Sequence, residues 1–425
     1  MTPPAEIFTG DTALSALALD RPTRLLVDDI LESAREYLDM DVAFAAEFMG
    51  DQQVFRGIAG DGALFGLAVG GRLPLGVMYC KAMTEGRFPE AVPDTAAEPL
   101  ASDRAITEQA GIRAYVGVPV SLPDGRVWGS MACISRRADY SVGKRDVRFM
   151  RMLARIYAEQ LEREEREAST RRQKRTSITT ILREHRLSTV LQPIVDLITG
   201  APVGFEALAR FDVENPQSPD VWFATAADVG LGRDLELAAV RSALQHIDHI
   251  PPETYLSLNV SPKTAVSDEF ASLIQSGSDA VIIEVTEHAA IDNYPLFNSS
   301  VARLRFRGMR YAVDDAGAGF SSFSHILSTK PDVVKLDISL IRDIDRDLGR
   351  RALLHGLIYF IEQINATVVA EGVETYEEAE ALKRLGVHCA QGYYFGRPGE
   401  TARIPSVIRT PVLRPQRVRV LPIAK

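Results

Sequence analysis

The feature that most constrains the fold is a rhythm of short apolar runs that begins at residue 187. Eight such runs follow one another, and amphipathic stretches such as 234–247, 295–308 and 350–365 lie between them. The runs are STVLQPIVD, PVGFEALAR, TYLSLNVS, AVIIEVTE, RYAVDDAG, PDVVKLD, ATVVAEGVE and VHCAQGYYF. Strand-like runs that alternate with helix-like segments favour an α/β fold, and eight repeats in roughly 220 residues predict a (β/α)8 barrel over 187–405.

The segment before the barrel predicts a separate mixed α/β domain over residues 20–165. Its helix-like and strand-like segments are, in order, 23–38, 41–48, 114–122, 127–135 and about 143–167. The last two strands flank the sequence PDGR, in which Pro, Asp and Gly indicate a tight turn. A hairpin of antiparallel strands is therefore expected there.

Between the two domains the chain becomes strongly charged, and residues 159–186 contain neither proline nor glycine. Acidic residues that precede basic ones favour an exposed helix, so 166–186 is expected to be a helical linker. The linker is either a solvated spacer or a helix that pairs in a dimer and carries a signal. Its apolar repeat is too short to distinguish these readings. Residues 406–425, with three prolines, are expected to form a C-terminal tail.

Charge and composition exclude several classes of function. The net charge of −9 argues against binding of a nucleic-acid polymer and against a polybasic membrane anchor. The N-terminus lacks the pattern of a signal peptide, and no apolar run is long enough to span a membrane. The three cysteines, Cys80, Cys133 and Cys389, fit no zinc or disulfide pattern. A cytoplasmic protein with reduced thiols is expected.

Polar residues recur where the predicted barrel strands end, which is where barrels carry their chemistry. They are Glu206, Asn259, Glu284, Asp314, Asp315, Lys335, Asp337, Glu371, Glu374 and Gln391. Mg²⁺ and Mn²⁺ prefer oxygen ligands, which carboxylates and an Asn carbonyl supply. We expect Glu206, with Asn259, Glu284 and Asp314, to face a metal ion. The adjacent pair Asp314–Asp315 could bridge two ions, an arrangement suited to phosphoester cleavage.

Two basic residues complete this hypothesis. Lys335 is expected to orient the attacking water or help deprotonate it, and Arg210, four residues after Glu206, to grip a phosphate. Taken singly, such residues also have structural roles: carboxylates cap helices, Asn259 could form a turn, and Lys335 with Asp337 could be a surface ion pair. The number of polar groups at one mouth favours a functional site.

These motifs identify a family resemblance. Residues 187–405 resemble the EAL-domain family of cyclic di-GMP phosphodiesterases, through LQPIVDL, EAL within GFEALAR, NVSP, EVTE, DDAGAG, PDVVKLD, EGVE and QGYYFGRP. The resemblance implies a modified (β/α)8 barrel that hydrolyses cyclic di-GMP to linear pGpG with two Mg²⁺ or Mn²⁺ ions. A receptor that binds cyclic di-GMP with little or no cleavage, acting by protein interaction, is the alternative. An interaction scaffold with a disused site is a third reading.

The resemblance also implies residue roles. Metal ligands would be Glu206, Asn259, Glu284, Asp314, Asp315 and Glu371. Catalytic roles would fall to Glu206, Lys335, Glu371, Gln391 and Glu287, of which Glu287 would hold the loop after Asp315. Gln192 and Arg210 would contact the substrate. The loop departs from the usual DFGTGYSS, because Ala316, Ala318 and Phe320 replace Phe, Thr and Tyr. The departure removes no ligand but leaves the loop's regulatory role in question.

Residues 20–165 look like a GAF domain, an α+β fold with a PAS-like antiparallel sheet. The hairpin at 114–135, the pair Tyr79–Cys80 and the closing helix carry this resemblance. It implies a sensory or dimerisation domain whose ligand, if it has one, is unknown. The whole chain is then expected to be a homodimeric phosphodiesterase regulated by its N-terminal domain.

Overall fold

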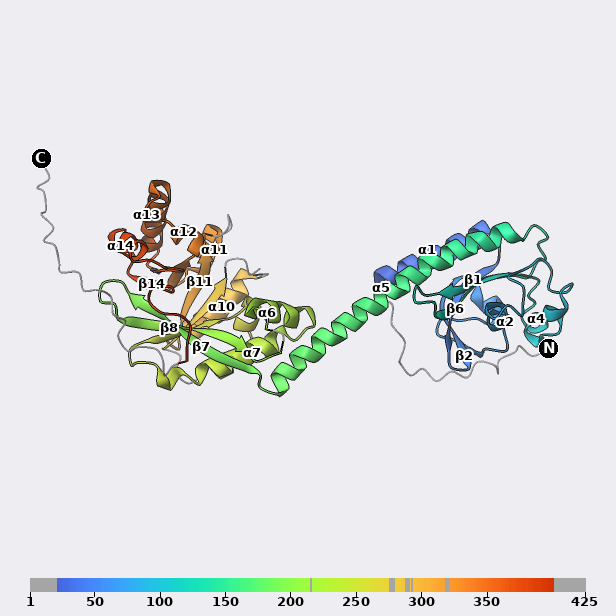
Figure 1. The fold of residues 1–425 in the computed structure, drawn as a ribbon, viewed down its shortest axis with the longest axis horizontal. Coiled ribbons are helices and arrows are strands. Elements are labelled where there is room, and N and C mark those ends of the chain that lie inside the picture. The colour runs from blue at the N-terminus through green and yellow to red at the C-terminus, as the bar shows by residue number, and fades with distance from the viewer. Residues whose placement is uncertain are drawn as a thin grey trace, which may run out of the picture. The chain divides into compact units, whose positions relative to one another are not determined.

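The computed structural model describes residues 21–400, apart from 215, 275–279, 287–290, 292 and 318–321 (Figure 1). Glu287, Ala318, Phe320 and the predicted tail 406–425 lie outside these described residues. The chain divides into two compact units, Met1–Thr170 and Arg171–Lys425. Each unit is described by itself below.

The N-terminal unit is built around one antiparallel sheet, in the strand order β3-β2-β1-β6-β5-β4. Its elements are α1 (Arg21–Tyr37), β1 (Val42–Met49), β2 (Gln52–Gly60), β3 (Arg72–Pro74), α2 (Cys80–Thr84), β4 (Ala91–Val92), α3 (Pro99–Ser102), α4 (Ala105–Gln109), β5 (Ala114–Ser121), β6 (Val127–Ser135) and α5 (Lys144–Arg183). The predicted hairpin is confirmed as β5 and β6. Gly125 in its turn adopts a φ of 85°, which glycine reaches without strain.

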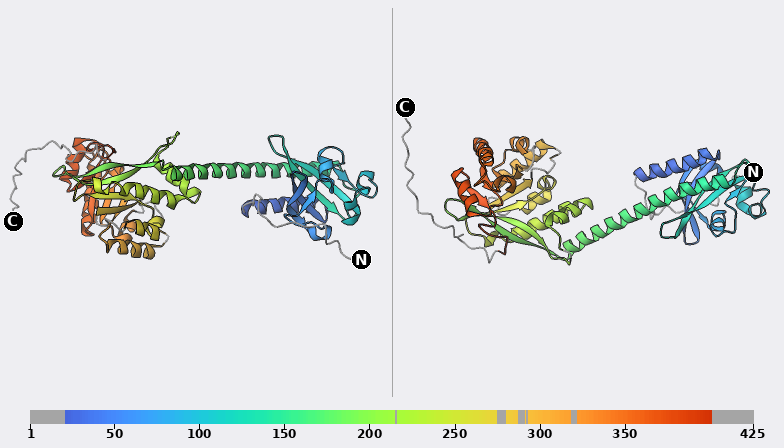
Figure 2. Two further views of the ribbon diagram at one scale, coloured as in Figure 1. Left: turned by 90° about the horizontal axis from the view of Figure 1, so that it is seen from below. Right: turned by 45° about the horizontal axis from the view of Figure 1, so that its top comes forward.

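Both faces of this sheet are buried, because alternate strand residues enter different cores. On β1, Ala43 and Ala45 face a cluster formed with α1 and α5, while Val42 and Phe44 face a second cluster under α2. Figures 1 and 2 show α1 lying alongside α5 in this unit. The sheet is thus enclosed on one side by the helix that opens the unit and the helix that leaves it.

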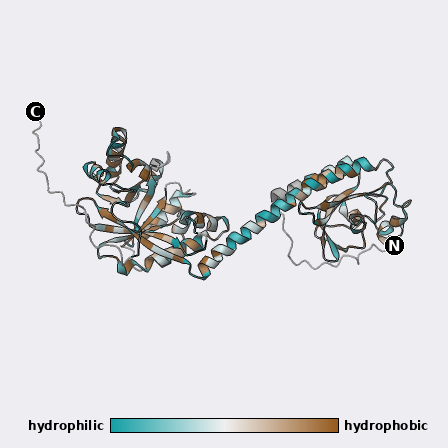
Figure 3. Ribbon diagram, viewed as in Figure 1, coloured by the Kyte–Doolittle hydropathy of each residue, from teal (hydrophilic) through white to brown (hydrophobic). Residues whose placement is uncertain are grey.

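Helix α5 is a single element of 40 residues, where the sequence predicted a closing helix followed by a linker. Its first part carries buried residues such as Met150 and Tyr157, and its later part is mainly hydrophilic (Figure 3). Ion pairs one turn apart, such as Arg163 with Glu167 at 2.9 Å, line the exposed surface. With no proline or glycine to stop it, the helix runs on from one unit into the next.

The second unit is a closed barrel of eight strands in the order β10-β11-β12-β13-β14-β7-β8-β9. Its strands are β7 (Leu187–Asp196), β8 (Pro202–Phe211), β9 (Tyr255–Asn259), β10 (Val281–Thr286), β11 (Arg310–Ala316), β12 (Val333–Leu336), β13 (Thr367–Ala370) and β14 (Cys389–Gln391). Its helices are α6 (Pro219–Asp228), α7 (Gly232–Leu244), α8 (Pro262–Ala265), α9 (Asp268–Leu273), α10 (Tyr294–Arg305), α11 (Ser322–Thr329), α12 (Ile338–Ile341), α13 (Leu348–Gln363) and α14 (Tyr376–Arg384). Each of the eight predicted apolar runs overlaps a different barrel strand.

The barrel is modified at its first strand, because β7 pairs antiparallel with both of its neighbours, β8 and β14. The other neighbouring strands are parallel. A five-residue connection, 197–201, joins β7 to β8, and Asp196 accepts hydrogen bonds from the backbone amides of Ile198 and Thr199 within it. A connection this short suits an antiparallel hairpin, since a parallel crossover needs a dozen residues or more.

The strands separate an inner from an outer apolar layer. The side chains of Tyr311 and Val313 join the large outer core formed with the surrounding helices, whereas Ala312 joins a smaller inner cluster that includes Ile282 and Val369. Within the described ranges, none of the helices combines the length and the apolar content needed to cross a membrane.

The core of the N-terminal unit provides a test of this packing. Phe55 is fully buried, and its ring meets that of Phe44 edge-on at a centroid distance of 5.2 Å. We expect Phe55→Ala to destabilise this unit by about 3–5 kcal/mol, because it leaves a cavity that the sheet cannot close. Calorimetry of the full chain should show an earlier transition for this unit. Leu64→Ala, at a residue that is 50% exposed, is the control and should change little; equal effects would contradict the assignment.

Candidate functional site

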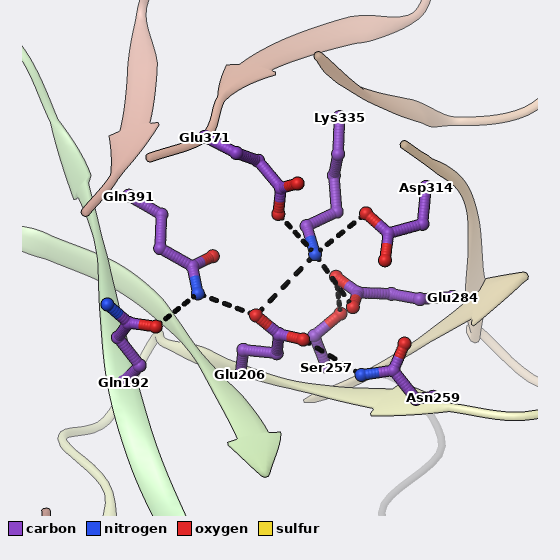
Figure 4. Close-up of polar contacts among 9 residues, drawn as sticks. All are labelled: Gln192, Glu206, Ser257, Asn259, Glu284, Asp314, Lys335, Glu371 and Gln391. Atoms are coloured by element: carbon purple, nitrogen blue, oxygen red, sulfur yellow. Dashed lines mark hydrogen bonds and ion pairs between the residues drawn. The ribbon is translucent and has the colours of Figure 1, made fainter. Parts of the chain in front are cut away.

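Polar side chains from every barrel strand or its end converge on a single mouth (Figure 4). They are Gln192 on β7, Glu206 on β8, Ser257 and Asn259 on β9, Glu284 on β10, Asp314 on β11, Lys335 on β12, Glu371 directly after β13, and Gln391 on β14. Parallel strands bring such residues together because their carboxyl ends share one edge of the sheet. Lateral pairing aligns Glu206 with Ser257, and Asn259 with Glu284.

Lys335 stands at the centre of this group. Its side chain is 1% exposed, and its Nζ atom is surrounded by four carboxylates. The distances from Nζ are 2.7 Å to Glu371, 2.9 Å to Glu284, 3.0 Å to Asp314 and 3.6 Å to Glu206. The sequence also allowed a surface ion pair between Lys335 and Asp337, which the structure does not contain. Asp337 instead caps helix α12, where its side chain accepts a hydrogen bond from the amide of Ser339.

The electrostatics follow from one buried cation among several buried acids. Burial works to lower the pKa of Lys335, but the four carboxylates outweigh it and hold that pKa well above its usual value. Burial raises the pKa of Glu284 to about 8 against the pull of Lys335, and raises the pKa of Glu371 well above its usual value. For Glu206, burial also acts upward, but Lys335 and the donors Gln391 and Asn259 lower the pKa overall. If all four carboxylates were ionised, they would carry more negative charge than one lysine can balance.

Asp314 and Asp315 are brought to the same side of β11 by a bulge. The pairing of β11 with β12 is regular at Val313 and resumes at Ala316, so the two aspartates together stand opposite the single residue Lys335. Asp315 takes a left-handed φ of 56°, an uncommon conformation for a residue with a side chain. In a regular strand these neighbours would point to opposite faces. With the bulge, both line one cleft, while Val313 and Ala316 both enter the outer core.

Amide side chains orient Glu206. The Nε2 atom of Gln391 donates to one Glu206 oxygen at 2.5 Å and to the side-chain oxygen of Gln192 at 3.0 Å. Asn259 donates to the other Glu206 oxygen at 2.8 Å. Glu206, the carboxylate inside the apolar run GFEALARF, is thus held on both sides by amides and faced by Lys335.

Ser257 is a site residue that the sequence analysis missed. Its hydroxyl donates to Glu284 at 2.5 Å, and both side chains are buried. The available signal was its spacing: Ser257 lies two residues before Asn259 on the same strand, so both face the same side.

A cleft of about 400 Å³ opens over this cluster. It is lined by Gln192, Glu206, Asp314, Asp315, Asp337, Ile338, Glu371, Gly372, Glu374, Gln391, Gly392 and Tyr393. Arg210, predicted to contact substrate, is not among these residues; its guanidinium donates to the carbonyl of Ala209. Glu287 lies outside the described residues.

The residues present fit divalent metal ions. Two groups of carboxylates, Glu206–Glu284–Asp314 and Asp314–Asp315–Glu371, each offer oxygens within 4.8 Å of one another, and Asp314 belongs to both. The side-chain oxygen of Gln391, Oε1, is buried and accepts no hydrogen bond. Such an all-oxygen donor set suits Mg²⁺ or Mn²⁺, and the excess negative charge would be balanced by cations.

Comparison with known proteins decides the family. The EAL domain family matches residues 174–398, slightly more than half of the chain. The chain belongs to the EAL family. The GAF domain family matches residues 23–161, so an EAL domain follows a GAF domain here. Both resemblances inferred from the sequence are confirmed, as is the modified barrel after an antiparallel-sheet domain.

Individual relatives resemble mainly the EAL part. The "Probable cyclic di-GMP phosphodiesterase PdeD" of Escherichia coli is 30% identical over 232 residues, covering 51% of this chain and 42% of PdeD. The oxygen sensor protein DosP of E. coli is 31% identical over 241 residues, covering 52% of this chain and 29% of DosP. The chain thus spans less than half the length of either relative. The PaMucR phosphodiesterase, solved as a c-di-GMP complex, shares the fold with a TM-score of 0.50. The two proteins are 24% identical over a match that covers 55% of this chain and 100% of that chain.

The buried lysine of this EAL site gives a prediction. We expect Lys335→Met to lower the thermal unfolding temperature of the barrel in the presence of EDTA, because removing one partner of a buried ion pair costs about 3–5 kcal/mol. Added Mn²⁺ should raise the unfolding temperature of this variant more than that of the unaltered protein, since the cation replaces the missing charge. Calorimetry with and without Mn²⁺ measures both effects. Lys383→Met, on the surface, is the control, and identical behaviour of the two variants would contradict the charge argument.

Proposed function

We propose that this protein is a metal-dependent phosphodiesterase that hydrolyses cyclic di-GMP to linear pGpG. The observation that carries the proposal is the group of four carboxylates around the buried Lys335, beneath an open cleft. Glu206, Glu284 and Asp314 are buried, and Glu371 is partly buried. An interaction scaffold would have no need to gather four acids, three of them buried, at a cost in stability. Membership of the EAL family and the name of PdeD support the same substrate.

Two Mg²⁺ or Mn²⁺ ions, when bound, would supply the charge that stabilises the attacking and leaving oxygens of a phosphodiester. The ligands we assign are the carboxylates of Glu206, Glu284, Asp314, Asp315 and Glu371, together with the side-chain oxygen of Asn259. Ser257 would fix the orientation of Glu284 through its hydrogen bond.

The remaining residues act on water and substrate. In this proposal Lys335 holds its proton and orients the attacking water, because the surrounding carboxylates keep its ammonium charged. The Nε2 atom of Gln391 aligns Glu206, while the side-chain oxygen of Gln391 stays free to accept a hydrogen bond from that water. Gln192 stands at the edge of the cleft, where it would contact a substrate phosphate or base. Arg210 would have to turn away from the Ala209 carbonyl to reach the substrate.

We assign regulation to the GAF domain and the active form to a homodimer. Helix α5 carries Met152 and Ile156 exposed at 51% and 43%, four residues apart on one helical face. A second copy of the helix would cover such a face. Any change in the sheet that packs on the first part of α5 would then be passed along a helix without breaks.

The alternative is a receptor that binds cyclic di-GMP without cleaving it. The specific observation in its favour is the altered loop after Asp315, in which Ala316 stands where the family usually has Phe. Binding of cyclic di-GMP in Ca²⁺, compared with turnover in Mg²⁺ or Mn²⁺, separates the two: a receptor binds in Ca²⁺ and yields no pGpG in either activating ion.

Glu206 provides the direct test. Glu206→Gln keeps the shape of the side chain but removes its charge, so pGpG formation should fall by at least about a hundredfold. Chromatography of cyclic di-GMP incubated with Mn²⁺ and either protein measures this. Glu377→Gln, at an exposed residue of α14, is the matched control and should retain activity. Undiminished hydrolysis by Glu206→Gln would overturn the assignment, and no product from the unaltered protein would favour the receptor.

Regulation through α5 gives a second test on the full chain. Inserting two alanines between Thr170 and Arg171, both exposed, rotates one part of the helix by about 200° against the other, whereas seven residues rotate it by only about 20°. If α5 carries the signal in its register, the first insertion should change the rate of pGpG formation severalfold and the second should restore it. Equal rates for all three proteins would show that α5 is a spacer.

A further inference from the structure

His325 is buried outside the cleft, and both of its ring nitrogens form hydrogen bonds. It lies on α11, with 3% of its surface exposed. Its Nδ1 atom is 3.2 Å from the hydroxyl of Tyr294, the first residue of α10. Its Nε2 atom is 3.2 Å from the hydroxyl of Tyr311 on β11. One imidazole therefore joins two helices and a barrel strand.

The side chains of Tyr294, His325 and Tyr311 form a row of two hydrogen bonds in which donors and acceptors are matched. A neutral imidazole has one donor and one acceptor nitrogen, and each tyrosine hydroxyl can play either role. Tyr311 is fully buried, and the partners of its hydroxyl are His325 and the side chain of Thr329, which also lies on α11. An apolar ring at position 325 would remove one of these two partners and would also break the link to Tyr294.

Tyr311 connects this chain to the metal-binding strand. It lies three residues before Asp314, with its side chain in the outer core. The Asp332 carboxylate accepts from the Tyr311 amide at 2.8 Å and from Arg305 at 3.0 Å, so Tyr311 is held at both its backbone and its hydroxyl. The hydrogen bond from Tyr311 to His325 closes a stretch of chain that contains Asp314 and Asp315.

We propose that His325 is a positioning residue that holds the Asp314–Asp315 bulge in its metal-binding geometry; the proposal rests on the metal-dependent function argued above. Asp315 has a left-handed backbone, which persists only where the surroundings impose it. The strand before the bulge is anchored through Tyr311, and α11 after it is anchored through His325, with Thr329 as a second contact to the Tyr311 hydroxyl. Separating these two anchors lets Asp315 relax toward an extended conformation, which turns its carboxylate away from Asp314.

Three substitutions at one position test the geometry. His325→Phe keeps a planar ring but makes neither hydrogen bond. His325→Gln places an amide near the former Nε2 atom and keeps the bond to Tyr311, whereas His325→Asn reaches only the position of Nδ1, toward Tyr294. Mn²⁺ binding to the full chain, measured by electron paramagnetic resonance without substrate, should weaken about tenfold in the Phe and Asn variants. The Gln variant should bind Mn²⁺ nearly as tightly as the unaltered protein.

Further variants keep the outcome decisive. His249→Phe, at an exposed histidine, is the control and should leave Mn²⁺ binding unchanged. If His325→Phe fails to fold, Tyr311→Phe removes a single hydroxyl and should give the same loss of affinity. Mn²⁺ binding that is unchanged in His325→Phe or, where that variant is unfolded, in Tyr311→Phe overturns the positioning role while the proposed function stands. An unaltered protein that binds no Mn²⁺ overturns both.

Discussion

The buried ammonium of Lys335 is the interaction on which the barrel's mouth depends. Four carboxylates lie within 3.6 Å of one Nζ atom, and burying any of them alone would be prohibitively costly. The lysine makes the arrangement tolerable in the protein without ions, but one positive charge cannot balance four negative ones. Burial, together with the neighbouring carboxylates, raises the pKa of Glu284 and Glu371. The same imbalance would favour divalent cations, so instability and metal affinity have one cause.

The reversed first strand lets the barrel close around this charge. Because β7 is antiparallel to both neighbours, its carboxyl end does not lie at the mouth of the barrel. The residue that β7 contributes to the mouth, Gln192, lies in the middle of the strand. Gln192 accepts from Gln391 across the seam where β14 meets β7, and Gln391 in turn donates to Glu206. The closure of the barrel and the orientation of a proposed metal ligand therefore share one row of amides.

Much of this architecture was predictable because it depends on local sequence patterns. Apolar runs such as PVGFEALAR identified the strands, and the polar residues at their ends pointed to one mouth. The direction of β7, the bulge at Asp315 and the continuity of α5 were not predicted from periodicity, since pairing direction and bulges depend on partner strands distant in the chain. Ser257 was missed because a serine within a strand resembles any other small residue. Its spacing to Asn259 places it on the same face, but the role itself comes from the hydrogen bond to Glu284, 27 residues later.

The bulge also explains how the unusual loop sequence is compatible with an intact acidic cluster. The extra residue in β11 shifts the inward–outward alternation of side chains by one position. Ala316 therefore enters the outer core, as Val313 does, and does not face the cleft. Gly317, with a φ of 105°, follows at once, and a side chain there would collide with Leu340. An alanine in place of a larger residue at 316 thus changes the packing behind the aspartates and not the proposed metal ligands themselves. In our proposal, with less bulk behind the bulge, its geometry depends more on hydrogen bonds such as those of His325.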